Sequence, residues 1–498
     1  MHSNRLFKIS FVAISATSFC FILRALVIDQ WGVEFALSET QKGELLGVGL
    51  WPFAITIVLF SLIIDRIGFR VTFWFAGLCH LAGLATLMSA SGYWMLYSGT
   101  FVMALGNGAV EAAANPLIAT LYADDKPRWL NRLHAAWPGG MILGGVLALA
   151  LGAHAGWQVK VGLMFVPVIA YVLLLIGARF PISERVASGV SYREMLAEAG
   201  WLSALMIILL IMMEVGRVGG LSTTATLALT GVMTTVYAFY ARSAGRPLYV
   251  VLVLLMIPLA ITELSTDSWI SSLMEPEMRA LGLQSGWVLI YASMIVFIIR
   301  LVAGSIIARL TPLGTLAGAS ALTAAGLFLL SGAQGAALLG AATLYGIGKS
   351  FFWGTSLAIG SEQFPRGGAV AINILAGAGM LAAGIVGSVL LGAAQDISTS
   401  RAIVAHDART GAHLADTYLE DRDGSLLGQY KALDTQRLAK GQASDRTIVA
   451  AIRADAKKAA LRDVALLPLV MLLTYAALAI FFRRRGGYRP VVLNATRH

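Results

Sequence analysis

Continuous runs of apolar residues, separated by short polar loops, extend through most of the sequence. A helix needs roughly 20 mostly apolar residues to cross a bilayer, and about fourteen segments qualify. The runs do not alternate with period two, as transmembrane strands would, and a helix satisfies its own backbone hydrogen bonds in lipid. The predicted spans are residues 7–28, 44–64, 71–91, 93–122, 131–154, 159–179, 198–216, 220–240, 247–271, 286–309, 313–332, 335–360, 367–393 and 463–482.

The composition agrees with this pattern. Of the 498 residues, 58% are hydrophobic and 13% are charged, and the mean hydropathy is +0.76; soluble domains are about 25% charged. A soluble fold could not bury so much apolar surface, so we predict an all-α integral membrane protein. The first run, 7–28, is too long for the apolar part of a signal peptide and lacks an evident cleavage site, so we expect it to be a retained span.

The net charge of +10 comes mainly from basic residues in short loops. Lys and Arg concentrate in the cytoplasmic loops of membrane proteins. With both termini in the cytoplasm, the basic loops 65–70, 124–132, 179–193 and 242–246 all lie inside. We therefore predict a multi-pass protein of the plasma membrane, such as a bacterial inner membrane. The same distribution argues against nucleic acid as a partner.

The chain also repeats itself. Ser61-Leu-Ile-Ile-Asp-Arg66 ends the second span and Ser305-Ile-Ile-Ala-Arg309 the tenth, while Gly106-Asn-Gly108 and Gly346-Ile-Gly348 lie in the fourth and twelfth. The two pairs are separated by nearly equal distances along the chain. Parallel repeats around a central site are a transporter architecture. The predicted domains are a six-helix bundle (1–180), a linker with two inserted helices (181–246), and a second six-helix bundle (247–498) with an extracytoplasmic loop at 394–462.

Charged residues inside the predicted spans are the main candidates for function, because such residues usually face a cavity or a partner. They are Arg24, Asp29, Glu111, Glu214, Arg217, Glu263, Asp267, Arg300 and Lys349. Several belong to the first and fourth helices of the two repeats. This placement predicts one polar site shared by both halves, with Arg24, Glu111, Glu263, Asp267 and Lys349 binding the solute. Arg300, nearer a helix end, could instead form a structural ion pair.

Helical spacing sharpens the assignment. Glu111 and Asn115 lie four residues apart and share a helix face, as do Glu263 and Asp267. Burial disfavours the charged form of a carboxyl group, so such a group can exchange a proton near neutral pH. We therefore expect Glu111, Asp29 and Glu263 to couple transport to protons. Alternatively, Glu111 could form an ion pair with Arg24 or Lys349 that only holds helices together.

Amide and aromatic residues give a second signal, since sugars are often held by amides at their hydroxyls and by a ring on their apolar face. Asn115, Asn131, Trp137, Trp353 and Asn373 are the candidates for such contacts. His134, between Asn131 and Trp137 at helical spacing, could respond to pH or could simply pack. Aromatic side chains at this spacing also serve packing alone.

Other chemistry finds no support in the sequence. It contains no phosphate-binding loop, nucleophile elbow, HExxH motif or Cys/His metal spacing, so we expect neither an enzyme nor a cofactor. Cys20 and Cys79 lie in apolar runs and are expected to be buried thiols.

The loop Ser61-Leu-Ile-Ile-Asp-Arg-Ile-Gly-Phe-Arg70 resembles the signature of the major facilitator superfamily between its second and third helices, G-x-L-a-D-R-x-G-R-K. Asp65, Arg66, Gly68 and Arg70 match it, while Ser61 and Phe69 depart from it. The resemblance implies two six-helix bundles, here with two inserted central helices. It also implies that the four matching residues form a cytoplasmic latch that stabilises one conformation.

Within that superfamily, Glu111-Ala-Ala-Ala-Asn115-Pro116 resembles the E-x-A-A-N-P motif of fucose-permease-like sugar:proton symporters. The resemblance implies that Glu111 handles substrate and protons. The first helix departs from the group, because Arg24 and Asp29 replace an Asn-rich segment with an aspartate. An anionic solute such as a uronic acid would suit Arg24 and Lys349.

We therefore predict a secondary transporter that takes up a monosaccharide or sugar acid together with protons by alternating access. Its partners would be that small polar solute, protons and the lipid bilayer. Two alternatives stay open at this point: an exporter or antiporter of amphipathic compounds, and a membrane sensor that uses residues 394–462 as its ligand domain.

Overall fold

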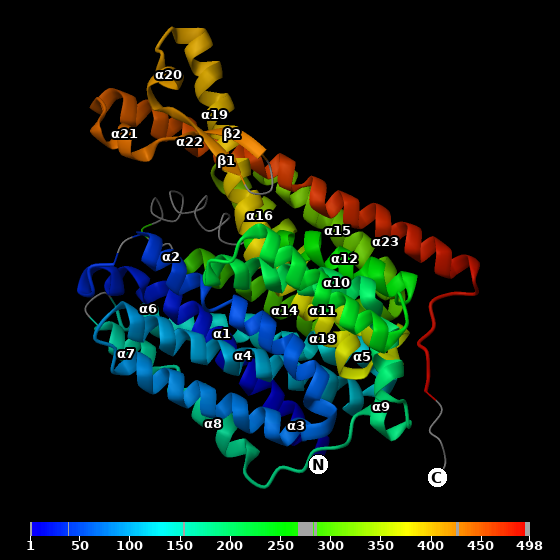
Figure 1. The fold of residues 1–498 in the computed structure, drawn as a ribbon. Helices are drawn as coiled ribbons and strands as arrows, with labels where there is room; N and C mark the ends of the chain where they lie inside the picture. The colour runs from blue at the N-terminus through cyan, green and yellow to red at the C-terminus, as the bar shows by residue number, and fades with distance from the viewer. Residues whose placement is uncertain are drawn as a thin grey trace.

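A computed structural model describes residues 2–37, 39–152, 155–266, 282, 286–424 and 428–493. Long helices form a bundle, and a small lobe projects from the end opposite the one where α1 begins (Figure 1). The predicted helical membrane class is confirmed, with the described strands confined to the lobe. Ten described segments are long and apolar enough to cross a membrane, so the predicted count of fourteen is not confirmed.

The first half of the chain contains the elements that follow, in chain order. They are α1 (His2–Glu34), α2 (Glu39–Gly47), α3 (Trp51–Met88), α4 (Tyr93–Leu121), η1 (Ala123–Asp125), α5 (Lys126–His134), α6 (Ala136–Ala150), α7 (Trp157–Gly162), α8 (Phe165–Leu175) and α9 (Glu184–Ala187).

Two predicted spans, 44–64 and 71–91, share the single element α3. Its path turns at Gly68, where φ is +81° and ψ is 157°. A positive φ is strained for residues with a Cβ, so glycine permits this turn. The turn belongs to the motif that Asp65 and Arg66 begin, and it explains why α3 counts once as a membrane-crossing segment.

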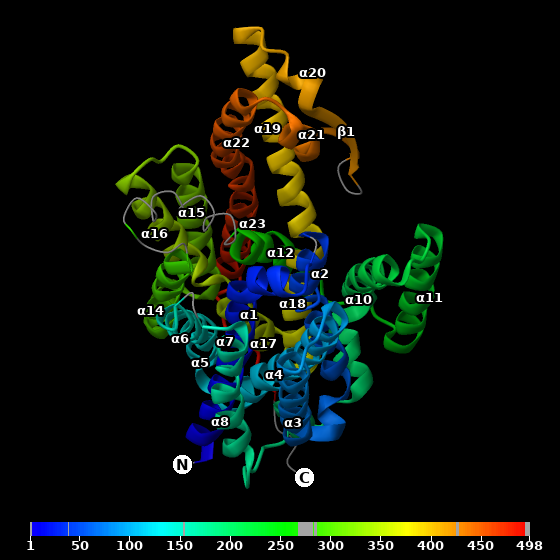
Figure 2. The same cartoon turned by 90° about the vertical axis from the view of Figure 1, so that its left-hand side faces the viewer.

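The central part of the chain forms α10 (Tyr192–Gly219) and α11 (Thr223–Ala241). Thr226, Thr230 and Thr234, spaced four apart, are the buried side chains in the body of α11. The opposite side of α11 exposes large apolar residues, including Phe239 at 77%. Small residues on a contact stripe allow close helix packing in membranes. Helix α11 stands at the periphery, beside α10 (Figure 2).

The second half continues to the last helix. Its elements are α12 (Pro247–Ala260), the π-helix η2 (Ile261–Ser265), α14 (Gly286–Leu310), α15 (Pro312–Leu330), α16 (Ala336–Lys349), α17 (Phe352–Gln363), η3 (Pro365–Gly367), α18 (Gly368–Leu381), the π-helix η4 (Ala382–Gly387), α19 (Ser388–Thr410) and α23 (Leu466–Arg484).

The lobe between α19 and α23 contains α20 (Leu414–Tyr418), strands β1 (Leu419–Gly424) and β2 (Gly428–Leu433), α21 (Thr435–Lys440) and α22 (Ala443–Val464). The strands pair antiparallel, with Leu419 opposite Leu433. An apolar cluster of its own includes Ile403, Leu414 and Val449. The sequence analysis placed an extracytoplasmic loop at 394–462 and did not predict the hairpin inside it.

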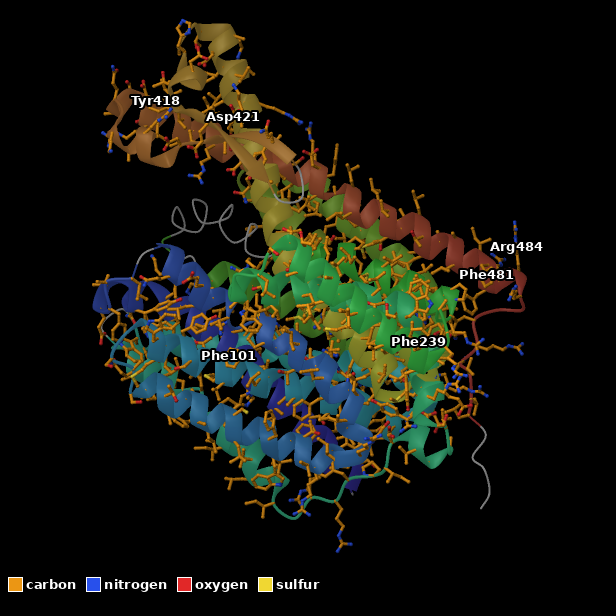
Figure 3. All side chains as sticks on the ribbon, in the orientation of Figure 1. Phe101, Phe239, Tyr418, Asp421, Phe481 and Arg484 are labelled. Atoms are coloured by element: carbon orange, nitrogen blue, oxygen red, sulfur yellow. The ribbon has the colours of Figure 1, made fainter. Side chains whose placement is uncertain are left out.

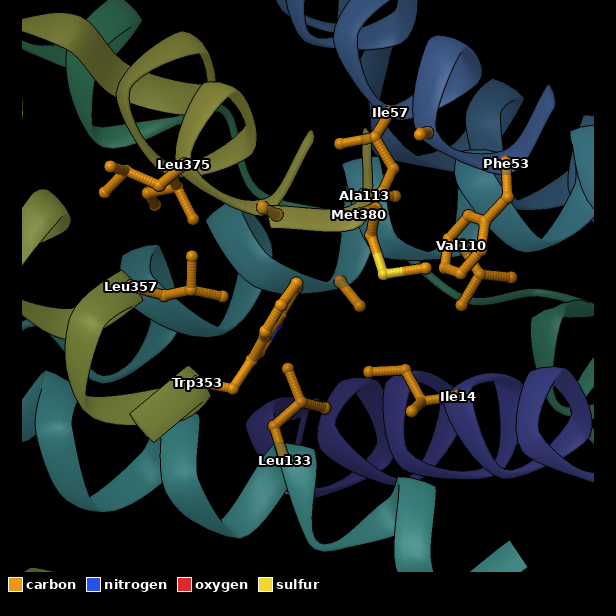
Figure 4. Close-up of a cluster of buried hydrophobic side chains, with 14 of the residues drawn as sticks. Ile14, Phe53, Ile57, Val110, Ala113, Leu133, Trp353, Leu357, Leu375 and Met380 are labelled. Atoms are coloured by element: carbon orange, nitrogen blue, oxygen red, sulfur yellow. The ribbon is translucent and has the colours of Figure 1, made fainter. Parts of the chain in front are cut away.

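The contacts between the two halves are reciprocal. Helix α3 packs against α18, and α14 packs against α5 and α6. In the predicted repeat, each pairing joins the second helix of one half to the fifth of the other, as two related bundles about a two-fold axis would give. The central contact is apolar, with Ile14, Phe53 and Val110 facing Trp353 and Met380 (Figure 4).

The outer surface is apolar where lipid is expected. Phe239 and Phe481 point outward from α11 and α23, whereas Asp421 lies on the lobe (Figure 3). Large apolar side chains on the outside of a bundle are unfavourable in water and favourable in hydrocarbon. The exposed side chains thus agree with lipid as the solvent around the bundle.

Candidate functional site

Glu111 and Asn115 form the start of a buried polar chain on α4. Glu111 is 4% exposed and Asn115 is fully buried. Asn115 Nδ2 donates to Glu111 Oε2 at 2.8 Å, as the predicted spacing allows. The amide oxygen, Asn115 Oδ1, accepts a hydrogen bond from His134 Nε2 at 3.0 Å. Asn115 therefore joins Glu111 to α5. Glu111 does not form the ion pair with Arg24 or Lys349 that was the alternative prediction.

Arg300 connects this chain to the second half. Its guanidinium, on α14, donates to the carbonyl oxygens of His134 at 2.9 Å and Ser350 at 3.1 Å. It also pairs with Glu263 Oε1 at 2.5 Å. Arg300 is 3% exposed. Its planar fork suits several fixed acceptors at once, so one cation holds α5, α14, η2 and the α16–α17 junction together.

Glu263 lies in η2, where the backbone changes from α-helix to π-helix. Such π-helical turns often occur at functional sites. The carbonyl of Thr262 accepts from Tyr345 Oη at 2.6 Å. Lys349, 3% exposed, lies over the Tyr345 ring with its Nζ 5.1 Å from the ring centre. Tyr345 therefore contacts both Lys349 and the residue that precedes Glu263.

Two predicted amides link the halves nearby. Asn131 Nδ2 donates to Thr355 Oγ1 at 3.2 Å and to the Pro127 carbonyl at 2.9 Å. Asn373 Nδ2 donates to the carbonyl of Ala112, next to Glu111, at 3.0 Å. The Oδ1 atoms of both amides are buried and have no hydrogen-bond partner among the described residues. Buried acceptors are normally paired, so these two oxygens are exceptions in a site that is otherwise hydrogen-bonded.

The aromatic candidates lie in two places. Trp353, at the start of α17, is 7% exposed and faces the centre of the bundle (Figure 4). Trp137 lies in the first turn of α6. Its ring is nearly parallel to that of Phe53, with 6.4 Å between the ring centres, and its ring centre is 5.9 Å from that of Phe21. Trp137 follows His134 by about one helical turn.

Arg24 does not join the polar chain. It is 5% exposed on α1, lies 6.0 Å from the Phe21 ring centre and covers Gly49. No hydrogen bond or ion pair joins Arg24 to Glu111, so the single site that includes both residues stays a prediction. Two further candidates are not placed, since Asp267 lies outside the described residues and the side chain of Asp29 is not among those described.

The predicted latch residues behave differently from one another. Asp65 accepts from Ser183 Oγ and from Arg185 Nε, both at 2.7 Å. Arg66 lies over the Tyr192 ring, with its Cζ 5.2 Å from the ring centre. Arg70 is exposed and forms no ion pair with a described residue. Of the charged members, Asp65 thus carries the buried contact.

Arg185, the partner of Asp65, extends the contact into the second half. The side chain of Arg185 packs against Gly368, since a Cβ added to Gly368 would lie only 3.1 Å from Arg185 Cβ and Cδ. Gly368, with φ of +50°, begins α18. The linker residue therefore connects the end of the second predicted span to the start of α18.

Sequence reasoning missed a second set of contacts at the same end of the molecule. Lys126 pairs with Glu184 at 2.8 Å and reaches the Ser361 carbonyl at 3.5 Å. Tyr488 in the C-terminal segment donates to Glu362 Oε2 at 2.7 Å, and the Val491 amide donates to the Glu362 carbonyl at 2.8 Å. Loop charges alone gave no signal for these pairings.

Sequence reasoning also gave the network around Arg300 too little weight. Arg300 and His134 were both recognised as unusual within apolar runs, and their shared environment was not. Among the described residues, no cluster of three or more His, Cys, Asp or Glu could hold a metal ion.

Residues 9–388 match the family model described as the Major Facilitator Superfamily. The chain belongs to this superfamily. Members of the superfamily are transporters and not enzymes. The polar chain and the Asp65 contact are thus features of a transporter. No curated protein sequence matches the chain significantly.

Solved structures of superfamily members and other transporters share the fold. A variant of the E. coli fucose:proton symporter FucP has 14% identity and a TM-score of 0.58, with 95% of this chain and 98% of that chain covered. The proton:xylose symporter XylE, bound to 6-bromo-6-deoxy-D-glucose, has 14% identity, a TM-score of 0.59 and 96% coverage of both chains. An auto-inhibited POT family peptide transporter has 15% identity and a TM-score of 0.60, with 99% and 100% covered. At these identities the likeness shows the fold alone.

Proposed function

We propose that this major facilitator superfamily member is a proton-coupled secondary transporter that takes up a monosaccharide or a sugar acid by alternating access. The observation that carries the proposal is the buried hydrogen-bonded chain Glu111–Asn115–His134–Arg300–Glu263, which passes from one half to the other. A chain of this kind lets a proton on one side chain change the contacts between the halves.

Arg300 is the element that senses the proton in this account. It pairs directly with Glu263 and lies within electrostatic range of Glu111. An ionised Glu111 attracts Arg300, and a protonated Glu111 does not. Protonation therefore weakens the attraction between α4 in the first half and α14 in the second. Because a transporter changes conformation by moving its halves, this difference biases which conformation is favoured.

The solute contacts would come from groups around that chain. The free Oδ1 acceptors of Asn131 and Asn373 suit hydroxyl donors. The faces of Trp137 and Trp353 suit the apolar face of a sugar ring. Since Asn131 bonds to Thr355 and Asn373 bonds to Ala112 across the halves, a solute held by these amides would contact both bundles.

The Asp65–Arg185 and Lys126–Glu184 pairs would act at the end where the termini lie, which the basic loops mark as cytoplasmic. They bring the two halves and the linker together there. Opening to that side would require these pairs to separate.

The test is uptake of labelled monosaccharides and sugar acids into proteoliposomes with and without an inward proton gradient. Gradient-driven accumulation of either class supports the proposal. Efflux of a hydrophobic dye with no accumulation would favour an exporter of amphipathic compounds.

The sensor alternative is tested by replacing residues 411–442 with a short Gly/Ser linker that joins α19 to α22. A transporter should retain flux, because the lobe has its own apolar cluster. A sensor would lose its response.

A further inference from the structure

Arg24 is a buried cation whose charge has no counter-ion in the described part of the chain. Its side chain is 5% exposed, and its Nε has no hydrogen-bond partner. By contrast, Arg300, similarly buried, has a carboxylate and two carbonyl oxygens as partners. Buried charges in proteins are normally paired, because removing an ion from water without compensation is highly unfavourable. Arg24 is therefore missing a partner that Arg300 has.

The surroundings of Arg24 are shaped for its guanidinium. A Cβ added to Gly49 would clash with both Nη1 and Nη2 of Arg24. Only glycine at position 49 leaves room for the side chain in this position. The Phe21 ring, 6.0 Å from Cζ, lies beside the same group. Cys20, also buried, is the titratable neighbour on the same helix.

Aromatic rings connect Arg24 to the polar chain. Phe21 contacts Trp137 at 5.9 Å between ring centres, and Trp137 follows His134 by one helical turn. Phe21 and Trp137 are both only partly buried. These two rings therefore link the surroundings of the unpaired cation to the helix that carries the Asn115–His134 contact.

We infer that Arg24 binds the carboxylate of the solute, so the substrate class is a sugar acid and not a neutral sugar. This inference rests on the proposed function and narrows it. A carboxylate supplies the missing counter-charge and matches the planar fork of the guanidinium. A neutral sugar hydroxyl supplies no charge and would leave the cation uncompensated. In this arrangement the sugar ring lies against Trp137, and its hydroxyls reach the amides of Asn131 and Asn373 around the polar chain.

The experiment compares D-glucuronate with D-glucose, which differ in the group at C6, as ligands of the purified full-length protein. Apparent affinities come from ligand-dependent thermal stabilisation at neutral pH. The wild type should prefer glucuronate. Arg24→Gln should lose that preference, with glucuronate affinity falling roughly tenfold or more, as expected for loss of a charge-assisted hydrogen bond. Arg24→Lys should retain part of it, since charge remains but the fork is lost.

Two further variants separate recognition from folding. Gly49→Ala keeps Arg24 but displaces its guanidinium, so it should also reduce the preference. Arg5→Gln removes a cation from the same helix that bonds to the carbonyls of Leu174 and Ile176, and it should leave the preference unchanged. The ratio of the two affinities is the readout, because a purely structural role for Arg24 would alter stability without altering that ratio.

Each outcome bears on the inference. No stabilisation by glucuronate, equal affinity for the two ligands, or an unchanged ratio in Arg24→Gln would overturn it. If glucose accumulates with a proton gradient and glucuronate does not, the proposed function stands and this inference fails. If glucuronate binds through Arg24 but no gradient drives its uptake, the inference stands and the proposed function fails.

Discussion

Arg300 Nη1 donates a hydrogen bond to the backbone carbonyl of His134 at 2.9 Å, and this contact joins α14 to the end of α5. The two residues are 166 positions apart and belong to different predicted bundles. The same guanidinium pairs with Glu263. A change at that ion pair is therefore transmitted to the backbone of the other half, beside the His134–Asn115 contact.

Glu111→Gln tests the proton role of this chain. The amide keeps an oxygen that can accept from Asn115, so the fold should persist. Unlike a carboxyl group, this amide cannot bind and release a proton near neutral pH. We expect proton-driven uptake to fall to the level seen without a gradient, while counterflow exchange continues. Glu214→Gln, at a charged residue of α10 paired with Arg217, is the matched control. Wild-type activity of Glu111→Gln in both assays would remove Glu111 from the mechanism.

A double-mutant cycle on Arg300 and Glu263 tests whether they act as a pair. Removing one partner of a buried ion pair costs about 3–5 kcal/mol, because the other charge stays buried. Arg300→Gln and Glu263→Gln should each be strongly destabilising. The double variant should be less destabilised than the sum of the two. Additive losses in thermal or denaturant unfolding would show that the pair is not coupled.

His80 offers a contrasting structural role. Its Nε2 donates to Asn107 Oδ1 at 2.9 Å, and its Nδ1 accepts from Tyr171 Oη at 2.8 Å. All these contacts lie within the first half. His80→Phe leaves two buried polar groups without a partner, so we expect a loss of about 1–3 kcal/mol in stability. The dependence of uptake on solute concentration should not change. A changed apparent affinity for the solute in a folded variant would contradict this structural role.

The C-terminal segment should restrain opening at the end where the termini lie. Truncation after Arg485 removes the Tyr488 and Val491 contacts to Glu362, next to the carbonyl of Ser361 that Lys126 reaches. A single cysteine at position 361, in a chain with Cys20→Ala and Cys79→Ala, should then react faster with a membrane-impermeant maleimide applied from that side. Tyr488→Phe should give an intermediate rate. Equal rates in all three proteins would show that the segment has no such role.

The membrane class and the contacts of some candidate residues could be predicted from the sequence, for identifiable reasons. Span length and charge distribution depend on the bilayer and are local properties. The four-residue spacing of Glu111 and Asn115 likewise guaranteed a shared helix face. The Asp65 loop was recognised because its motif is contiguous, and its turn at Gly68 is a local backbone property.

The remaining features depend on contacts between distant segments. The sequence analysis placed Arg300 nearer a helix end, whereas it lies in the body of α14. Only the packing of α14 against its neighbours shows that its partners are Glu263 and the carbonyls of His134 and Ser350. Every residue has a backbone carbonyl, so the sequence does not indicate which carbonyl accepts a given hydrogen bond. The hairpin at 419–433 was also missed, since its strands are rich in charged residues and show no alternating apolar pattern.

The most direct test of the account is proton movement into proteoliposomes when solute is added outside. With a pH-sensitive dye in the lumen, glucuronate or glucose should acidify the lumen of wild-type vesicles as the solute enters, and Glu111→Gln should abolish the acidification. Solute entry into wild-type vesicles with no change in luminal pH would contradict proton coupling through the buried chain.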